Sequence, residues 1–139
     1  MKIVKIAVPV LLILILCSAF ISPKTDYKKE TATFLASIIK GEVDKAYDEL
    51  LSNSLLANKL EEVKLQKEKT KTAITLYGKL IGYESVKTQK YGNSIVRLVY
   101  VLRCERMPVV WEFYFYKAAS DWKLTSVKFN DEYDLLADK

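Results

Sequence analysis

Residues Val109–Lys117 have the sequence VVWEFYFYK, in which large aromatic side chains stand at alternate positions. Trp111, Phe113 and Phe115 share one parity, while a glutamate and two tyrosines share the other. Side chains of a β-strand point alternately to its two faces, so the odd positions form the better core face. The stretch therefore predicts a strand whose aromatic face must be covered by other elements.

Stretches rich in β-branched and aromatic residues lie on both sides of residues 109–117, and short turn sequences separate them. The predicted strands and turns are, in order, Leu80–Gln89, Tyr91-Gly92-Asn93, Ser94–Arg106, Met107-Pro108, residues 109–117, Ala119-Ser120-Asp121 and Trp122–Asn130. Tight turns join antiparallel neighbours, so we expect a four-stranded antiparallel meander. The alternation breaks between Leu124 and Val127, which predicts a β-bulge in the last strand.

The chain before residue 78 has helical periodicity. Apolar residues recur at helical spacing from Tyr27 until Gly41 ends the first segment, and Val43–Leu51 forms a strongly amphipathic second segment. The stretch Lys59–Tyr77 is a third, less apolar helix. We therefore expect an α+β fold, with N-terminal helices packed on the concave face of a curved four-stranded antiparallel sheet.

The N-terminus has the pattern of a secretory signal peptide. Lys2 and Lys5 precede the unbroken apolar run at residues 6–16, and small residues up to Ala19 follow it. We predict that residues 1–19 are removed, leaving one domain, residues 20–139, in the periplasm or outside the cell.

Two alternatives keep the protein attached to the membrane. An uncleaved anchor of 16 residues, 6–21, would span about 24 Å, less than the bilayer core of about 30 Å. A lipoprotein would be attached through Cys17, but the residue before it, Leu16, is bulky. After cleavage, we expect no membrane contact.

Charge argues against a nucleic-acid partner. The whole chain carries 22 basic and 17 acidic residues, or +5, and loss of Lys2 and Lys5 leaves 20 minus 17, or +3. The most basic stretch, residues 59–71, is interrupted by glutamates and contains no aromatic residue. It is typical of a solvated helix face, so we expect no nucleic-acid binding.

The composition excludes most catalytic machinery. The chain has no histidine, and only Cys104 remains after cleavage, so we expect neither a metal site nor a cofactor. Gly78 and Gly82 have no phosphate-loop spacing around them. Cys104 lies in a predicted strand and is expected to be a buried, small apolar residue, although an unpaired thiol can also link two chains.

The order of these elements and several short motifs resemble small exported members of the nuclear transport factor 2-like superfamily, which also includes ketosteroid isomerase-like and cystatin-like folds. The motifs are Gly41, Asp44-Lys45-Ala46-Tyr47, Gly82-Tyr83-Glu84, residues 110–116 and Asp121-Trp122-Lys123-Leu124. The resemblance covers the chain from about Thr25 to Asn130. It implies a cone-shaped fold with a cavity between the helices and the sheet, and no assigned activity.

Such a cavity would suit an apolar small molecule. Its expected lining is Phe34, Tyr47, Leu50, Trp111, Phe113, Phe115, Trp122 and Leu124. The same aromatic residues are needed simply to stabilise a domain of this size, and they then fill the cone. The sequence leaves both possibilities open.

An isomerase-like enzyme would need a carboxylate base facing a tyrosine donor across the cavity. The candidate bases are Asp44, Asp48, Glu84 and Glu112, and the candidate donors are Tyr47, Tyr83 and Tyr100. No spacing selects one pair. We therefore expect a non-enzymatic domain of the cell envelope, either a small-molecule binder or a protein-interaction module, with the isomerase as the alternative.

The outward-facing side of the sheet is unusually apolar for a solvated face. It carries Arg97, Val99, Val101, Arg103, Glu112, Tyr114 and Tyr116. Tyrosine and arginine around an apolar centre are typical of interfaces, so we expect a homodimer through this face. The alternative is that the C-terminal segment Glu132–Lys139 covers it with Leu135 and Leu136.

The first prediction concerns export. N-terminal sequencing of protein recovered outside the cytoplasm is expected to begin at Phe20, because Ala19 completes the cleavage pattern. Recovery of chains that begin at Met1 would instead support a membrane anchor.

Overall fold

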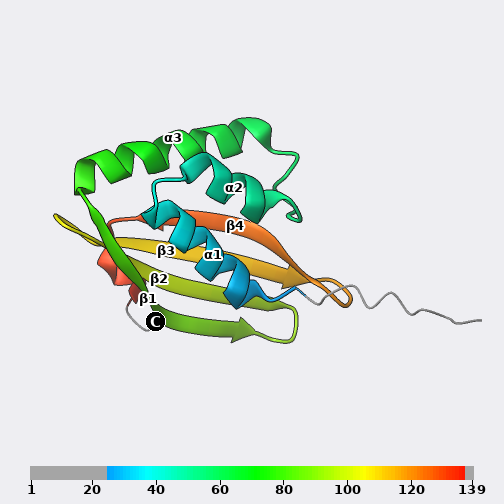
Figure 1. Ribbon diagram of the computed structural model, residues 1–139. Helices are drawn as coiled ribbons and strands as arrows, with labels where there is room; N and C mark the ends of the chain where they lie inside the picture. Colours follow the sequence, from blue (N-terminus) through cyan, green and yellow to red (C-terminus); the bar gives the residue numbers. More distant parts are fainter. Residues whose placement is uncertain (1–24, 137–139) are drawn as a thin grey trace, which may run out of the picture.

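The structure is a computed structural model, and it describes residues 25–136, without the side chains of residues 134 and 135. The predicted signal peptide, residues 1–19, lies outside the described residues. The elements are α1 (Tyr27–Ile39), α2 (Val43–Leu51), α3 (Leu60–Tyr77), β1 (Leu80–Tyr91), β2 (Ile95–Cys104), β3 (Val109–Lys117), β4 (Trp122–Asn130) and a 3-10 helix, η1 (Tyr133–Leu136). Three helices followed by an antiparallel sheet confirm the α+β class (Figure 1).

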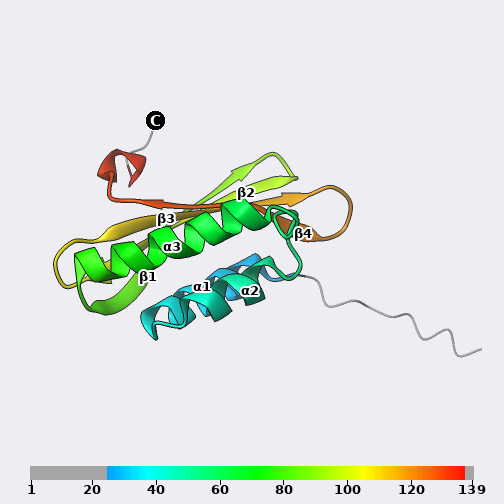
Figure 2. The same ribbon diagram turned by 90° about the horizontal axis from the view of Figure 1, so that it is seen from above.

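The strands are hydrogen-bonded in the order β1-β2-β3-β4, so β1 and β4 are the two edges. The helices α1 and α2 cover one face of the sheet, which we call the inner face, and α3 runs along the β4 side (Figures 1 and 2). Figure 2 shows η1 on the opposite side, the outer face. Among residues 25–136, no helix combines the length and apolarity that crossing a bilayer requires.

Local sequence signals set the first two helices. The Asp26 carboxylate caps α1 by accepting hydrogen bonds from the backbone N–H groups of Lys28 and Lys29, at 3.1 and 3.2 Å. The helix ends before Gly41, whose φ of +80° is a conformation that glycine adopts without strain. The turn there lets α2 fold back against α1.

The inner face of the sheet is the core. Cross-strand pairing sets Leu98 opposite Phe113 and Tyr100 opposite Trp111. The Phe34 ring of α1 meets Trp111 and Phe113 of β3 at centroid distances of 5.2 and 5.6 Å, in edge-to-face geometry. The predicted parity of residues 109–117 is therefore confirmed, and the odd positions face the helices.

Two details of the strands differ from the sequence-based expectation or refine it. The second strand covers residues 95–104, not 94–106, because the backbone N–H groups of Glu105 and Arg106 bond to the carbonyls of Lys79 and Tyr77 in the preceding connection. The predicted bulge is Thr125, which is the extra residue between the pairs Phe115–Leu124 and Tyr114–Ser126. On either side of Thr125, the side chains of β4 therefore still point alternately to the two faces of the sheet.

The second prediction compares the two tryptophans. Trp111→Ala is expected to lower the free energy of unfolding by about 3–5 kcal/mol, because Trp111 is only 1% exposed and its removal leaves a cavity. Trp122→Ala is expected to cost about 1–2 kcal/mol, since Trp122 is half-buried at the sheet end. Urea denaturation measures both, and equal losses would contradict the assigned packing.

Candidate functional site

The space between the helices and the sheet, where the sequence predicted a ligand cavity, is filled by side chains of the domain. Of the expected lining residues, seven are buried in one cluster and Trp122 packs against it half-buried; the buried ones are Phe34, Tyr47, Leu50, Trp111, Phe113, Phe115 and Leu124. A cavity of about 10 Å³ remains between α3 and the sheet, beside Trp111 and Cys104. That volume is close to the minimum for one water molecule.

The small cavity adjoins an unsatisfied donor and a buried thiol. Trp111 Nε1 is buried and meets no hydrogen-bond acceptor in the described part of the chain. Cys104 is the free, buried cysteine of residues 25–136, and burial raises the pKa of its thiol. The thiol therefore remains protonated at neutral pH, as expected for a small core residue.

Two of the three tyrosines proposed as donors have hydrogen-bond partners on the helices. Tyr47 Oη lies 2.9 Å from Thr70 Oγ1 of α3, and Tyr100 Oη lies 3.1 Å from Thr31 Oγ1 of α1. Burial raises the pKa of Tyr47 to about 12, although its hydrogen bond with Thr70 acts in the opposite direction. Tyr83 is half-buried, and its ring contacts that of Tyr100 at a centroid distance of 6.0 Å.

The candidate carboxylates lie away from these hydroxyls. Asp44 and Asp48 pair with lysines of α3 on the exposed side of α2, at 3.1 and 2.6 Å. Glu84 is exposed on β1, and Glu112 lies on the outer face. The structure does not bring any of these four carboxylates to one cavity with Tyr47, Tyr83 and Tyr100.

The outer face holds a hydrogen-bonded polar cluster that the sequence did not reveal. Arg97 Nε donates to Glu112 Oε2 at 2.7 Å, and both side chains are about nine-tenths buried. Arg97 also donates to the amide oxygen of Gln89, and Tyr114 Oη donates to Glu112 Oε2 at 3.3 Å. Val99, which pairs with Glu112 across β2 and β3, is fully buried.

One end of the outer face carries exposed apolar residues in register. Tyr91 of β1 pairs with Ile95 of β2, which pairs with Tyr116 of β3. Their exposed fractions are 48%, 38% and 40%. We call these three residues the apolar row.

The C-terminal segment lies at the opposite end of the outer face (Figure 2). Tyr133 Oη of η1 donates to the carbonyl of Pro108, at the β2–β3 turn, and Leu136 is half-buried. The Leu135 side chain and residues 137–139 of the segment Glu132–Lys139 lie outside the described residues. The homodimer and the covering C-terminal segment, which the sequence left as alternatives, therefore concern different ends of this face.

Of the predicted outer-face residues, Arg97, Val99 and Glu112 are buried within the sheet surface, whereas Arg103 and Tyr116 are exposed. The sequence pattern did not point to Tyr91, Ile95 and Gln89. The predicted first strand ended at Gln89 and Tyr91 was expected in the turn, which is wrong: β1 continues to Tyr91, and the turn lies at residues 92–94. This one-step shift of the hairpin sets Tyr91 opposite Ile95.

No family model, curated protein or solved structure matches this chain. The resemblance to the nuclear transport factor 2-like superfamily thus remains a prediction from the motifs.

The third prediction concerns Tyr47. Its pKa is about 12 in the folded chain, whereas an unperturbed tyrosine has a pKa of 10.0. The buried phenol therefore stabilises the fold fully below about pH 10, and this contribution is lost as the pH rises toward 12. Tyr47→Phe is expected to flatten the fall in stability over this interval by about 2–3 kcal/mol. Below about pH 10 it should cost about 1 kcal/mol, because the Thr70 hydrogen bond is lost.

Urea midpoints at a series of pH values measure the effect. An alkaline fall equally steep in Tyr47→Phe and in the wild type would show that Tyr47 is not the buried phenol described.

Proposed function

We propose that the chain is a non-enzymatic interaction domain of the cell envelope, exported after signal cleavage, with the cone-shaped fold of the nuclear transport factor 2-like superfamily. Its working surface is the outer face of the sheet, and the partner is a second copy of the chain. The apolar row is the observation that carries this proposal.

Exposed apolar residues in one contiguous row are costly for a monomer unless a partner covers them. Tyr91, Ile95 and Tyr116 are adjacent across three strands and belong to no helix-covered surface. A shallow hollow of about 400 Å³ lies beside them, lined partly by Tyr114 and Lys128. Large apolar side chains beside a hollow provide complementary shapes for an interface.

A two-fold dimer requires a surface that is complementary to itself. Exposed charges of both signs lie on the outer face, with Glu84 on β1, Arg103 on β2 and Lys128 on β4, so the face offers opposite charges to a copy of itself. The buried Arg97–Glu112 pair adds no net charge to the middle. Two copies related by a two-fold axis can therefore place the apolar rows together without opposing like charges at the centre.

The inner face supports the non-enzymatic part of the proposal. Its hydroxyls bond to threonines, and the candidate carboxylates lie on other surfaces. An isomerase-like reaction would require both groups beside one substrate.

The fourth prediction tests the dimer. Sedimentation equilibrium at micromolar concentration is expected to give twice the chain mass for the wild type and the chain mass for Tyr116→Glu, because a buried, unpaired carboxylate is strongly unfavourable in an interface. Circular dichroism checks that the variant is folded.

The matched control is Leu76→Glu. Leu76 is an exposed apolar residue of α3, 59% accessible, and lies away from the outer face. This variant is expected to remain dimeric. A monomeric wild type, or dissociation by Leu76→Glu alone, would contradict the proposed surface.

A further inference from the structure

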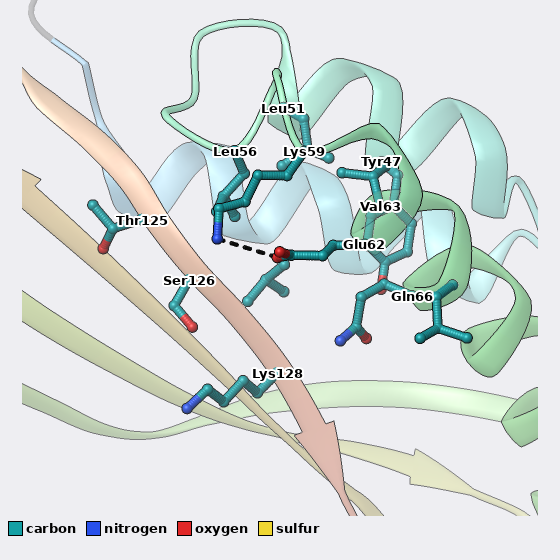
Figure 3. Close-up of a pocket in the computed structure, with 12 residues that line it drawn as sticks. Tyr47, Leu51, Leu56, Lys59, Glu62, Val63, Gln66, Thr125, Ser126 and Lys128 are labelled. Carbon is teal, nitrogen blue, oxygen red and sulfur yellow. Dashed lines mark hydrogen bonds and ion pairs between the residues drawn. The ribbon is translucent and has the colours of Figure 1, made fainter.

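A groove of about 270 Å³ lies between the first half of α3 and the free edge of β4 (Figure 3). Leu56, Lys59, Glu62 and Val63 line its helix side, and β4 forms the other side. The groove borders the filled interior at Tyr47 and Val127. It shares Thr125, Ser126 and Lys128 with the hollow beside the apolar row, but none of the three residues of that row lines it.

Four consecutive residues of β4, Thr125–Lys128, form one wall of the groove. Val127 is buried on the inner face, whereas Ser126 and Lys128 pair with outer-face residues of β3. Because neighbouring side chains of a strand point to opposite faces, what these residues share along the groove is their backbone. The wall is therefore the edge of the sheet itself.

Strand pairing shows which backbone groups face the groove. Lys117 donates its backbone N–H to Ser94 at 2.8 Å, so odd-numbered residues of β3 direct their backbone groups toward β2. Val127 and Phe129 lie opposite odd-numbered residues, Phe113 and Trp111. Their own N–H and C=O groups consequently point away from β3, to the free edge.

The connection between α2 and α3 already hydrogen-bonds to the edge of β4 just before the bulge. The backbone N–H of Leu55 donates to the Leu124 carbonyl at 3.2 Å, and Ser54 Oγ donates to the same oxygen at 3.0 Å. The connection then turns away into α3, which begins at Leu60. The connection before α3 therefore bonds to β4 at Leu124 and leaves the strand there. The edge that the groove exposes begins after it, beyond the Thr125 bulge.

We propose that this groove binds an extended peptide by strand addition, with apolar and acidic residues alternating along it. The peptide becomes a fifth strand beside β4, and its backbone bonds with the edge groups of Val127 and Phe129.

Side chains of the groove specify the alternation. An added strand directs every second side chain to the inner side, where Leu56, Val63 and Val127 form an apolar wall. The remaining side chains point to the outer side, where Lys128 of β4 lies. Valine or leucine suits the first set, and glutamate or aspartate suits the second.

The carboxylate already present in the groove does not repel an acidic peptide strongly. Glu62 Oε2 lies 3.2 Å from Lys59 Nζ, so the two charges compensate each other, as Figure 3 shows. Lys128, on the other wall, has no ion pair within the described part of the chain. The groove therefore has a cation available for the peptide.

A second copy of the chain does not fit this edge. Two β4 strands that bond to each other through the edge groups of both Val127 and Phe129 would set Lys128 of one copy directly opposite Lys128 of the other, on the outer side. Like charges directly opposite each other in a sheet are destabilising. An acidic peptide is consequently the occupant that the charges favour.

The test uses the full chain and a blocked hexapeptide of alternating valine and glutamate as the probe. Hydrogen exchange followed by NMR is expected to slow about tenfold or more at the Val127 and Phe129 amides when peptide saturates the chain, because a bonded amide must open before it exchanges. A peptide with identical side chains but N-methylated valines and glutamates lacks the backbone donors and should give no slowing.

A variant pair tests the charge preference. Lys128→Gln is expected to weaken peptide binding about threefold, which corresponds to one exposed ion pair. Lys64→Gln, a change at an exposed lysine of α3 outside the groove, should leave binding unchanged. Tyr116→Glu should also bind as the wild type does, which separates this site from the dimer.

Strand addition is overturned if the amides of Val127 and Phe129 exchange equally fast with and without peptide. It is also overturned if the N-methylated peptide slows them as much as the unmodified one. Equal binding by a valine–lysine peptide would overturn the acidic specificity.

Discussion

The Phe34 ring is the contact on which the packing of this domain depends. It projects from α1 and meets Tyr47 of α2 at 5.1 Å, and Trp111 and Phe113 of β3 at 5.2 and 5.6 Å. One side chain thus joins two helices to the central part of the sheet. Edge-to-face contacts of this kind fix orientation as well as bury area, so the angle between the helix layer and the strands follows from them.

The sheet could be predicted from the sequence because the patterns that indicate strands and turns involve only neighbouring residues. Alternation over residues 109–117 and the turn at Met107-Pro108 depend only on neighbours, and the bulge at Thr125 interrupts a period of two that is visible in the letters. The Arg97–Glu112 pair was not visible, although both residues were expected on the outer face. Their contact depends on the register of β2 against β3, which the length of the turn sets.

The groove beside β4 was not predictable for a related reason. Lys59–Tyr77 has a weak apolar pattern, and in the structure Thr70 is the one fully buried residue of α3. Long-range contacts hold α3 against α2: the hydrogen bond between Thr70 and Tyr47, and two ion pairs between lysines of α3 and aspartates of α2. Sequence periodicity indicates that a helix forms, but it does not indicate how far that helix stands from a strand edge.

The sparse burial of α3 also separates two levels of stability within the domain. Leu60, Leu65 and Leu76 are exposed, whereas Val63, Ile74 and Tyr77 pack against the core. The second half of α3 faces Ile38, Leu102 and Trp111, which detaching the helix would uncover on one side. The aromatic contacts of Phe34 lie beneath α1 and α2 and stay intact when α3 leaves. Local opening of the α3 layer therefore costs less free energy than global unfolding, which must also break the contacts of α1 and α2 with the sheet.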